Sequence, residues 1–119
     1  MRESARATGG RYEAKAAAFL EKMGIRVLEQ NFRCRTGEID LIAREGEYLC
    51  FVEVKFRESG ACGEPLGAVD RKKQRRISRT ALFYLMKKGL PDSTPCRFDV
   101  VGITPDGIEV IRDAFPYTQ

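Results

Sequence analysis

The chain has 119 residues, of which 43% are hydrophobic, and this size suits one domain with its own apolar core. It contains no histidine, which excludes Ser-His-Asp triads, Cys-His dyads and His-ligated metal sites within the chain. Its 21 Lys and Arg exceed its 17 Asp and Glu, and the net charge of +4 fits either an anionic partner, nucleic acid before acidic membrane, or a merely basic soluble protein.

The N-terminal segment predicts a flexible arm followed by a helix. Residues 1–10 are small and polar and end in two glycines, with Arg2 and Arg6 able to contact phosphate. Residues 11–23 are rich in alanine and place their apolar side chains at helical spacing. The first ten residues lack the apolar stretch of a signal peptide, and no segment approaches the roughly 18 apolar residues of a membrane span. We therefore expect a cytoplasmic protein with no membrane partner.

Three strands are predicted to follow. Residues 26–32 form the first, residues 38–43 the second and residues 47–56 the third, which is dense in aromatic and β-branched side chains. The turn signal Glu45-Gly46 predicts a hairpin between the second and third strands. The four cysteines, Cys34, Cys50, Cys62 and Cys96, form no C-x-x-C pair, so we expect reduced thiols rather than a zinc ribbon.

The second half predicts a loop, a long helix and a closing hairpin. Residues 57–67 contain three glycines and Pro65, which indicates a loop. Residues 70–88 form the long helix, and residues 97–104 and 107–111 form the hairpin. The predicted order is α-β-β-β-α-β-β, an α/β domain of two or three layers with a mixed central sheet, spanning residues 11–119.

Charged side chains gather on the predicted central hairpin. Strand side chains alternate between faces, so Glu38 and Asp40 share one face, as do Glu53 and Lys55. Closing the hairpin around Glu45-Gly46 sets Glu38 opposite Glu53 and Asp40 diagonal to Glu53, with all four groups on one side. Carboxylates this close to a core need a counter-ion, and a hard cation such as Mg²⁺ (or Mn²⁺) suits them.

Lys55 could then hold the attacking water or a substrate phosphate. The competing interpretation is structural: Glu53 and Lys55 form an ordinary charge pair on a solvated strand, and Asp40 is an ordinary surface acid. The matching parity of the two strands favours the metal site.

The long helix carries a run of positive charge without an acid. Ile77, Ala81, Tyr84 and Leu85 define its buried stripe. The side chains that fall opposite this stripe are Lys72, Arg75, Arg76 and Arg79. Lys73 and Gln74 instead fall toward the sheet in the first turn. The run is either a solvated polar face or a contact surface for nucleic-acid phosphates, and its single sign favours the second.

The residues of the hairpin and helix resemble the PD-(D/E)XK nuclease superfamily, whose hallmark is an acid on the second strand and an acid-x-lysine on the third. Asp40 and Glu53-Val54-Lys55 match it. More closely, the chain resembles the YraN-like bacterial family, related to archaeal Holliday-junction resolvases. The segments that carry the resemblance are GRYEA (10–14), NFRCRTGEIDLIA (31–43), FVEVKFR (51–57), AVDRKKQRRI (68–77) and RFDVV (97–101).

The resemblance implies a restriction-endonuclease-like fold and further site residues. Glu13 on the first helix matches an acid that related resolvases add to the metal site. Gln74 matches a polar residue on the helix after the core motif. Ile39 stands where the superfamily has proline. The implied metal ligands are Glu13, Asp40 and Glu53, and the implied catalytic residues are Asp40, Glu53, Lys55 and Gln74.

Three functions compete. The first is a metal-dependent endonuclease on DNA, branched or damaged, in repair or recombination. The residues for nucleic-acid binding are then Lys72, Lys73, Arg75, Arg76 and Arg79, and cutting both strands would favour a homodimer. The second is a nucleic-acid-binding adaptor that keeps the fold without turnover. The third is an interaction module that uses residues 57–67 and 114–117 to bind another protein.

Overall fold

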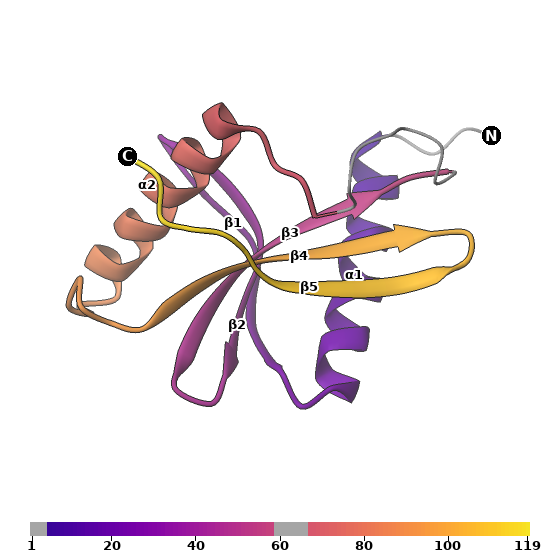
Figure 1. Cartoon of the computed structure of the whole chain (residues 1–119), viewed down its shortest axis with the longest axis horizontal. Coiled ribbons are helices and arrows are strands. Elements are labelled where there is room, and N and C mark those ends of the chain that lie inside the picture. The colour runs from indigo at the N-terminus through magenta and orange to yellow at the C-terminus, as the bar shows by residue number, and fades with distance from the viewer. Residues whose placement is uncertain (1–4, 59–66) are drawn as a thin grey trace.

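The structure, a computed structural model, describes residues 5–58 and 67–119 (Figure 1). Its described part contains two helices and five strands in the predicted order. Their bounds are α1 (Ala5–Lys22), β1 (Arg26–Cys34), β2 (Gly37–Glu45), β3 (Tyr48–Phe56), α2 (Arg71–Lys87), β4 (Cys96–Thr104) and β5 (Gly107–Phe115). No helix in these ranges is long and apolar enough to cross a membrane.

The strands form one mixed sheet in the order β1-β2-β3-β4-β5. β1, β2 and β3 pair antiparallel, β3 pairs parallel with β4, and β4 pairs antiparallel with β5. A parallel pair needs a crossover connection, and the segment that contains α2 provides it between β3 and β4. The predicted mixed sheet and both predicted hairpins are confirmed.

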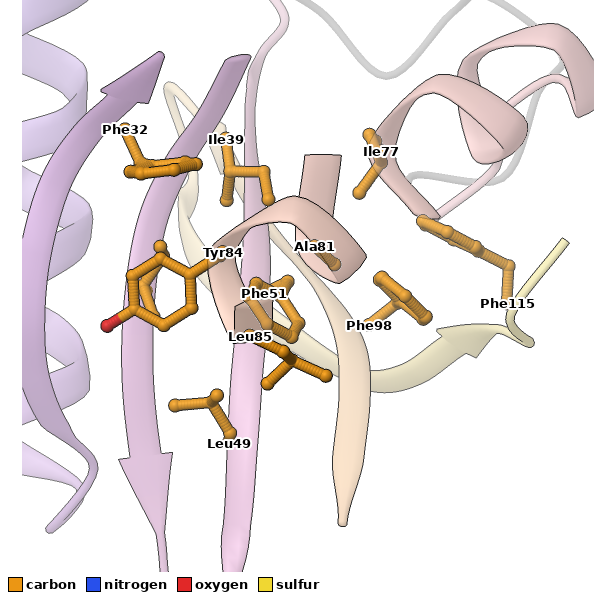
Figure 2. Packing of buried hydrophobic residues seen from close by; sticks show 11 residues of the cluster. Phe32, Ile39, Leu49, Phe51, Ile77, Ala81, Tyr84, Leu85, Phe98 and Phe115 are labelled. Atoms are coloured by element: carbon orange, nitrogen blue, oxygen red, sulfur yellow. The ribbon is translucent and has the colours of Figure 1, made fainter. Parts of the chain in front are cut away.

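The two helices cover opposite faces of the sheet, so the domain has three layers. The α1 face is closed by Ala16, Leu20, Leu41, Val52 and Val101, among other buried side chains. The α2 face has its own cluster, and there Phe51 makes an edge contact to Tyr84 with ring centroids 5.8 Å apart (Figure 2). In Figure 1 the strongly twisted sheet runs between the two helices. Both apolar sides of the sheet are therefore buried.

The long helix begins where the sequence predicts. Asp70 is its N-cap, and the Asp70 Oδ1 accepts a hydrogen bond from the Lys73 N–H at 2.8 Å. The predicted stripe of Ile77, Ala81, Tyr84 and Leu85 is buried. The first turn of α2 is consequently fixed against the sheet, with its basic face turned outward.

α1 and β5 extend furthest beyond their predicted bounds. α1 begins at Ala5 rather than residue 11, because two consecutive glycines, each costing about 1 kcal/mol of helix propensity, do not stop a helix in an alanine-rich context. The predicted arm is therefore wrong for residues 5–10, and residues 1–4 lie outside the described part. β5 extends past residue 111 to Phe115, which pairs with Phe98 across an irregularity in the ladder.

The hairpin between β2 and β3 closes one residue later than predicted. Glu45 pairs with Tyr48, so the turn is Gly46-Glu47, and Gly46 adopts the positive φ of 60° that a tight turn requires. Leu41 then pairs with Val52. Continuing this register places Asp40 level with Glu53 instead of diagonal to it. The register moved by an even number, but the alternation of β2 breaks beside Asp40, because Ile39 and Ile42 both face α2 whereas Leu41 and Ala43 face α1.

Most of the predicted loop at residues 57–67 lies outside the described residues, as does Cys62. Within the described part, Cys34, Cys50 and Cys96 are free thiols.

Candidate functional site

Acidic side chains from two elements converge beyond the last paired residues of β2 and β3. Glu38 and Asp40 come from β2, and Glu13 comes from α1. Each offers one carboxylate oxygen, and these oxygens lie within 4.8 Å of one another. We call Glu13, Glu38 and Asp40 the acidic cluster. Carboxylate oxygens at this separation can share one hard cation.

Asp40 lies at the centre of this arrangement. The β2–β3 pairing reaches only to Leu41 and Val52, and beyond it the Val54 N–H donates to the Asp40 Oδ2 at 2.8 Å. Burial and then the negative charge of Glu53 raise the pKa of Asp40 from 3.8 to about 7. The Val54 bond opposes this shift, and Glu13 and Glu38 add to it. The carboxyl of Asp40 therefore titrates near neutral pH.

Glu13 brings an unsatisfied oxygen to the cluster. Its Oε2 is buried and has no hydrogen-bond partner in the described part of the chain. Burial raises the pKa of the Glu13 carboxyl, and the charge of Glu38 contributes to the shift. A buried polar atom without a partner costs about 1–3 kcal/mol, so this oxygen is suited to an external ligand.

Glu53 lies nearby but is paired differently. Its carboxylate accepts from the Lys73 Nζ at 2.6 Å, and its side chain is only 11% exposed. This contact confirms that Lys73 turns toward the sheet. The acidic cluster thus contains Glu38 where the resemblance implied Glu53. Glu53 acts on the cluster through its charge on Asp40.

Glu38 and Asp40 of the cluster line a cleft of about 460 Å³, which we call the acidic cleft. Asp40 and Glu53 line the same cleft. Its lining is polar except at Cys34, Gly37 and Ile77, and consists of Arg33, Cys34, Gly37, Glu38, Asp40, Glu53, Lys73, Arg76 and Ile77. The space between the two acids is therefore open to a ligand rather than filled by apolar packing.

Lys55 and Gln74 are held outside the acidic cleft. The Lys55 ammonium donates to the Ala68 carbonyl and lines a neighbouring cavity of about 280 Å³, which shares Lys73 with the cleft. The Gln74 Nε2 donates to the Val69 carbonyl at 2.7 Å, and its Oε1 accepts from the Thr118 hydroxyl at 3.0 Å. Gln74 is thus engaged by the C-terminal segment, and its catalytic role stays a prediction.

Arg33 is a site residue that sequence reasoning missed. It forms an ion pair with Glu38 at 2.9 Å, and the two residues are register partners between β1 and β2. The signal was available in the turn residues Arg35-Thr36, which close a second hairpin and bring Arg33 opposite Glu38. Arg33 therefore neutralises part of the charge at the exposed edge of the cluster.

A known protein family matches the part of the chain that contains this site. The family model of uncharacterised protein family UPF0102 matches residues 12–103. The chain belongs to UPF0102. The UPF0102 match runs from α1 into β4 and so includes all four acids described above.

Curated UPF0102 proteins resemble this chain over nearly its whole length. A UPF0102 protein of Syntrophus aciditrophicus is 55% identical over 112 residues, which cover 91% of this chain and 87% of that protein. One from Lachnoclostridium phytofermentans is 50% identical over 103 residues, 87% of each chain. One from Marinobacter nauticus is 49% identical over 104 residues, 87% of this chain and 84% of the relative. The chain is therefore comparable in length to these relatives.

Proposed function

We propose that this UPF0102 protein is a metal-dependent endonuclease that hydrolyses phosphodiesters in DNA, with branched or damaged DNA as the preferred form. The observation that carries the proposal is the convergence of three carboxylates within 4.8 Å of one another beside a cleft lined by Lys73 and Arg76. The resemblance to PD-(D/E)XK nucleases supports the same reaction. Carboxylates that can bind a metal cation lie beside Lys and Arg side chains that can bind a phosphate, and hydrolysis of a phosphodiester uses both.

The residues present fit Mg²⁺ or Mn²⁺. The buried Glu13 Oε2 lacks a partner among the described residues, and all the candidate ligands are hard oxygen donors. Glu13, Glu38 and Asp40 would hold the ion, with Glu53 available once Lys73 releases it. A bound divalent ion supplies an acidified water and neutralises charge on a phosphoryl oxygen.

The side chains around the cluster divide the remaining tasks. The Val54 N–H orients the Asp40 carboxylate, and Lys73 holds Glu53 at the cleft. Lys55, in the adjoining cavity, offers a compact positive charge to a phosphate or to a water molecule. Lys73 and Arg76 attract the substrate backbone into the cleft.

The proposal is tested by incubating plasmid and four-way-junction DNA with the protein in Mg²⁺ or Mn²⁺. We expect cleavage by the native protein and a loss of at least about a hundredfold in Asp40→Ala and Lys55→Ala. Asp92→Ala serves as the matched control, because Asp92 is exposed in the connection between α2 and β4. Cleavage that survives both substitutions would assign it to another site or to a contaminant.

A second candidate function is a DNA-binding adaptor without turnover. The ion pair between Glu53 and Lys73 at 2.6 Å favours it, because an internal ammonium already neutralises one of the acids. The engagement of Gln74 by Val69 and Thr118 points the same way. The adaptor predicts salt-sensitive DNA binding and no cleavage with any divalent ion, so the same incubation separates the two functions.

A further inference from the structure

A second hollow adjoins the acidic cleft, and we call it the arginine pocket. It has a volume of about 390 Å³ and is lined by Arg35, Thr36, Lys72, Arg75, Arg76 and Arg79. Arg35 and Thr36 come from the turn between β1 and β2, whereas the other four come from α2. Two elements far apart in the sequence thus contribute to one basic surface.

The cations of this pocket have no acidic partner in the described part of the chain. The ion pairs of that part involve other cations, namely Arg33, Lys73, Lys88, Arg97 and Arg112. Five positive side chains that share one pocket repel each other. An anion bound among them would relieve that repulsion, so the pocket favours binding of a negatively charged ligand.

The pocket has a fixed framework rather than a loose cluster of side chains. The Thr36 hydroxyl lies 3.1 Å from the Thr80 hydroxyl, which itself donates to the Arg76 carbonyl at 2.9 Å. Gly37 allows a close approach, because a Cβ there would lie 2.9 Å from the Arg76 Cγ. The β1–β2 turn therefore packs against α2, and the turn contributes Arg35 to the pocket while α2 contributes Arg79.

Arg76 connects the two hollows, because it lines both the acidic cleft and the arginine pocket. A ligand that follows the surface from the cleft therefore passes Arg76 into the pocket. Guanidinium groups recognise phosphate through paired N–H donors, and four of the five cations are arginines. A polynucleotide offers the matching ligand, a series of phosphates joined at a regular spacing.

We propose that the arginine pocket binds a backbone phosphate of the DNA strand whose neighbouring phosphate occupies the acidic cleft. This inference rests on the proposed function and specifies its substrate. The protein recognises a phosphate beyond the scissile one, so its substrate is an extended strand. A small phosphodiester such as bis(p-nitrophenyl) phosphate reaches the acidic cleft without using the pocket.

The test measures affinity for a fluorescein-labelled four-way-junction DNA by anisotropy, in EDTA and at several salt concentrations. We expect Arg35→Gln and Arg79→Gln each to weaken binding roughly tenfold at about 0.1 M salt and to lower the slope of log K against log salt by about 0.9. Arg26→Gln is the matched control, since Arg26 is exposed at the opposite end of β1 from Cys34. Unchanged affinity in both pocket variants, or equal weakening in the control, would overturn the inference.

A second measurement separates this inference from the nuclease proposal. With Mn²⁺, we expect both pocket variants to raise the KM for DNA cleavage about tenfold and to leave hydrolysis of bis(p-nitrophenyl) phosphate unchanged. If the variants lose affinity in EDTA and no form cleaves DNA, the pocket stands and the nuclease proposal fails. If cleavage occurs with an unaltered KM in both variants, the nuclease stands and the pocket is refuted.

Discussion

Asp40 is the side chain on which the acidic cluster depends. It is the member that accepts from the Val54 N–H at 2.8 Å, and the charges of Glu13, Glu38 and Glu53 all act on it. The same surroundings raise the pKa of Asp40 to about 7. Without a bound cation, protonation of Asp40 therefore relieves the negative charge of the cluster near neutral pH.

This pKa predicts how Asp40→Asn changes stability with pH. The folded-state pKa of about 7 exceeds the ordinary value of 3.8, so the folded protein holds an extra proton between these values. The free energy of unfolding therefore falls as pH rises through that range. Asparagine removes the charge and keeps an acceptor for Val54. In EDTA we expect it to raise the free energy of unfolding by roughly 2 kcal/mol at pH 8, and by less toward pH 4.

Urea unfolding of both proteins at several pH values measures this difference. A gain that stays constant with pH would show that Asp40 does not titrate abnormally.

At the scale of elements, the docking of the β1–β2 turn onto α2 joins the site to the basic surface. Gly37 makes this possible, since an added Cβ would lie 2.9 Å from the Arg76 Cγ and 3.1 Å from the Thr80 Oγ1. α2 also supplies Lys73 to Glu53 on its inner side. The helix and the turn therefore form both hollows together.

The glycines that begin β2 and β5 provide a matched pair for testing this docking. Gly37 has a φ of 152° and Gly107 a φ of 149°, but only Gly37 has neighbours within 4 Å of an added Cβ. Both alanine variants should lose about 1–3 kcal/mol of stability from backbone strain. We expect the larger loss in Gly37→Ala, which should also weaken DNA binding.

Thermal unfolding and the anisotropy assay report the two effects. Equal losses of stability and unaltered DNA affinity in both variants would mean that the contact with Arg76 does not shape the pocket.

At the scale of the whole molecule, the two apolar clusters hold one helix on each face of the sheet, and the site lies where the pairing of β2 with β3 ends. Phe51, 1% exposed, is central to the α2 face, with ring centroids 5.8 Å from both Tyr84 and Phe98. This packing fixes the distance of α2 from β3. The position of Lys73 over Glu53 therefore depends on an apolar core that contains none of the acids.

Truncation of Phe51 should reveal this dependence. We expect Phe51→Ala to cost about 3–5 kcal/mol, because the substitution leaves a cavity between the helix and the sheet. Phe83 of α2 is 43% exposed, and Phe83→Ala should cost less than about 1 kcal/mol. Chemical denaturation gives both values, and a similar small loss in each would show that the α2 face is loosely packed.

The sequence predicts what depends on local pattern and misses what depends on contacts between distant segments. The buried stripe of α2 follows from residue spacing, whereas the face on which Asp40 lies does not, because the alternation of β2 breaks between Ile39 and Ile42. The register between β2 and β3 was not predicted correctly, because Gly46 is the first residue of the turn rather than the second. The arginine pocket was also missed in part, since Arg35 meets α2 only through the folded turn.

The measurement that tests the central claim most directly is a calorimetric titration of the protein with Mn²⁺ at pH 8, where Asp40 is largely ionised. The acidic cluster predicts saturable binding of about one ion per chain by the native protein, with the affinity falling at least tenfold in both Asp40→Asn and Glu13→Gln. Asp92→Asn should bind like the native protein. The absence of binding, or binding that both cluster variants retain in full, would contradict the metal site.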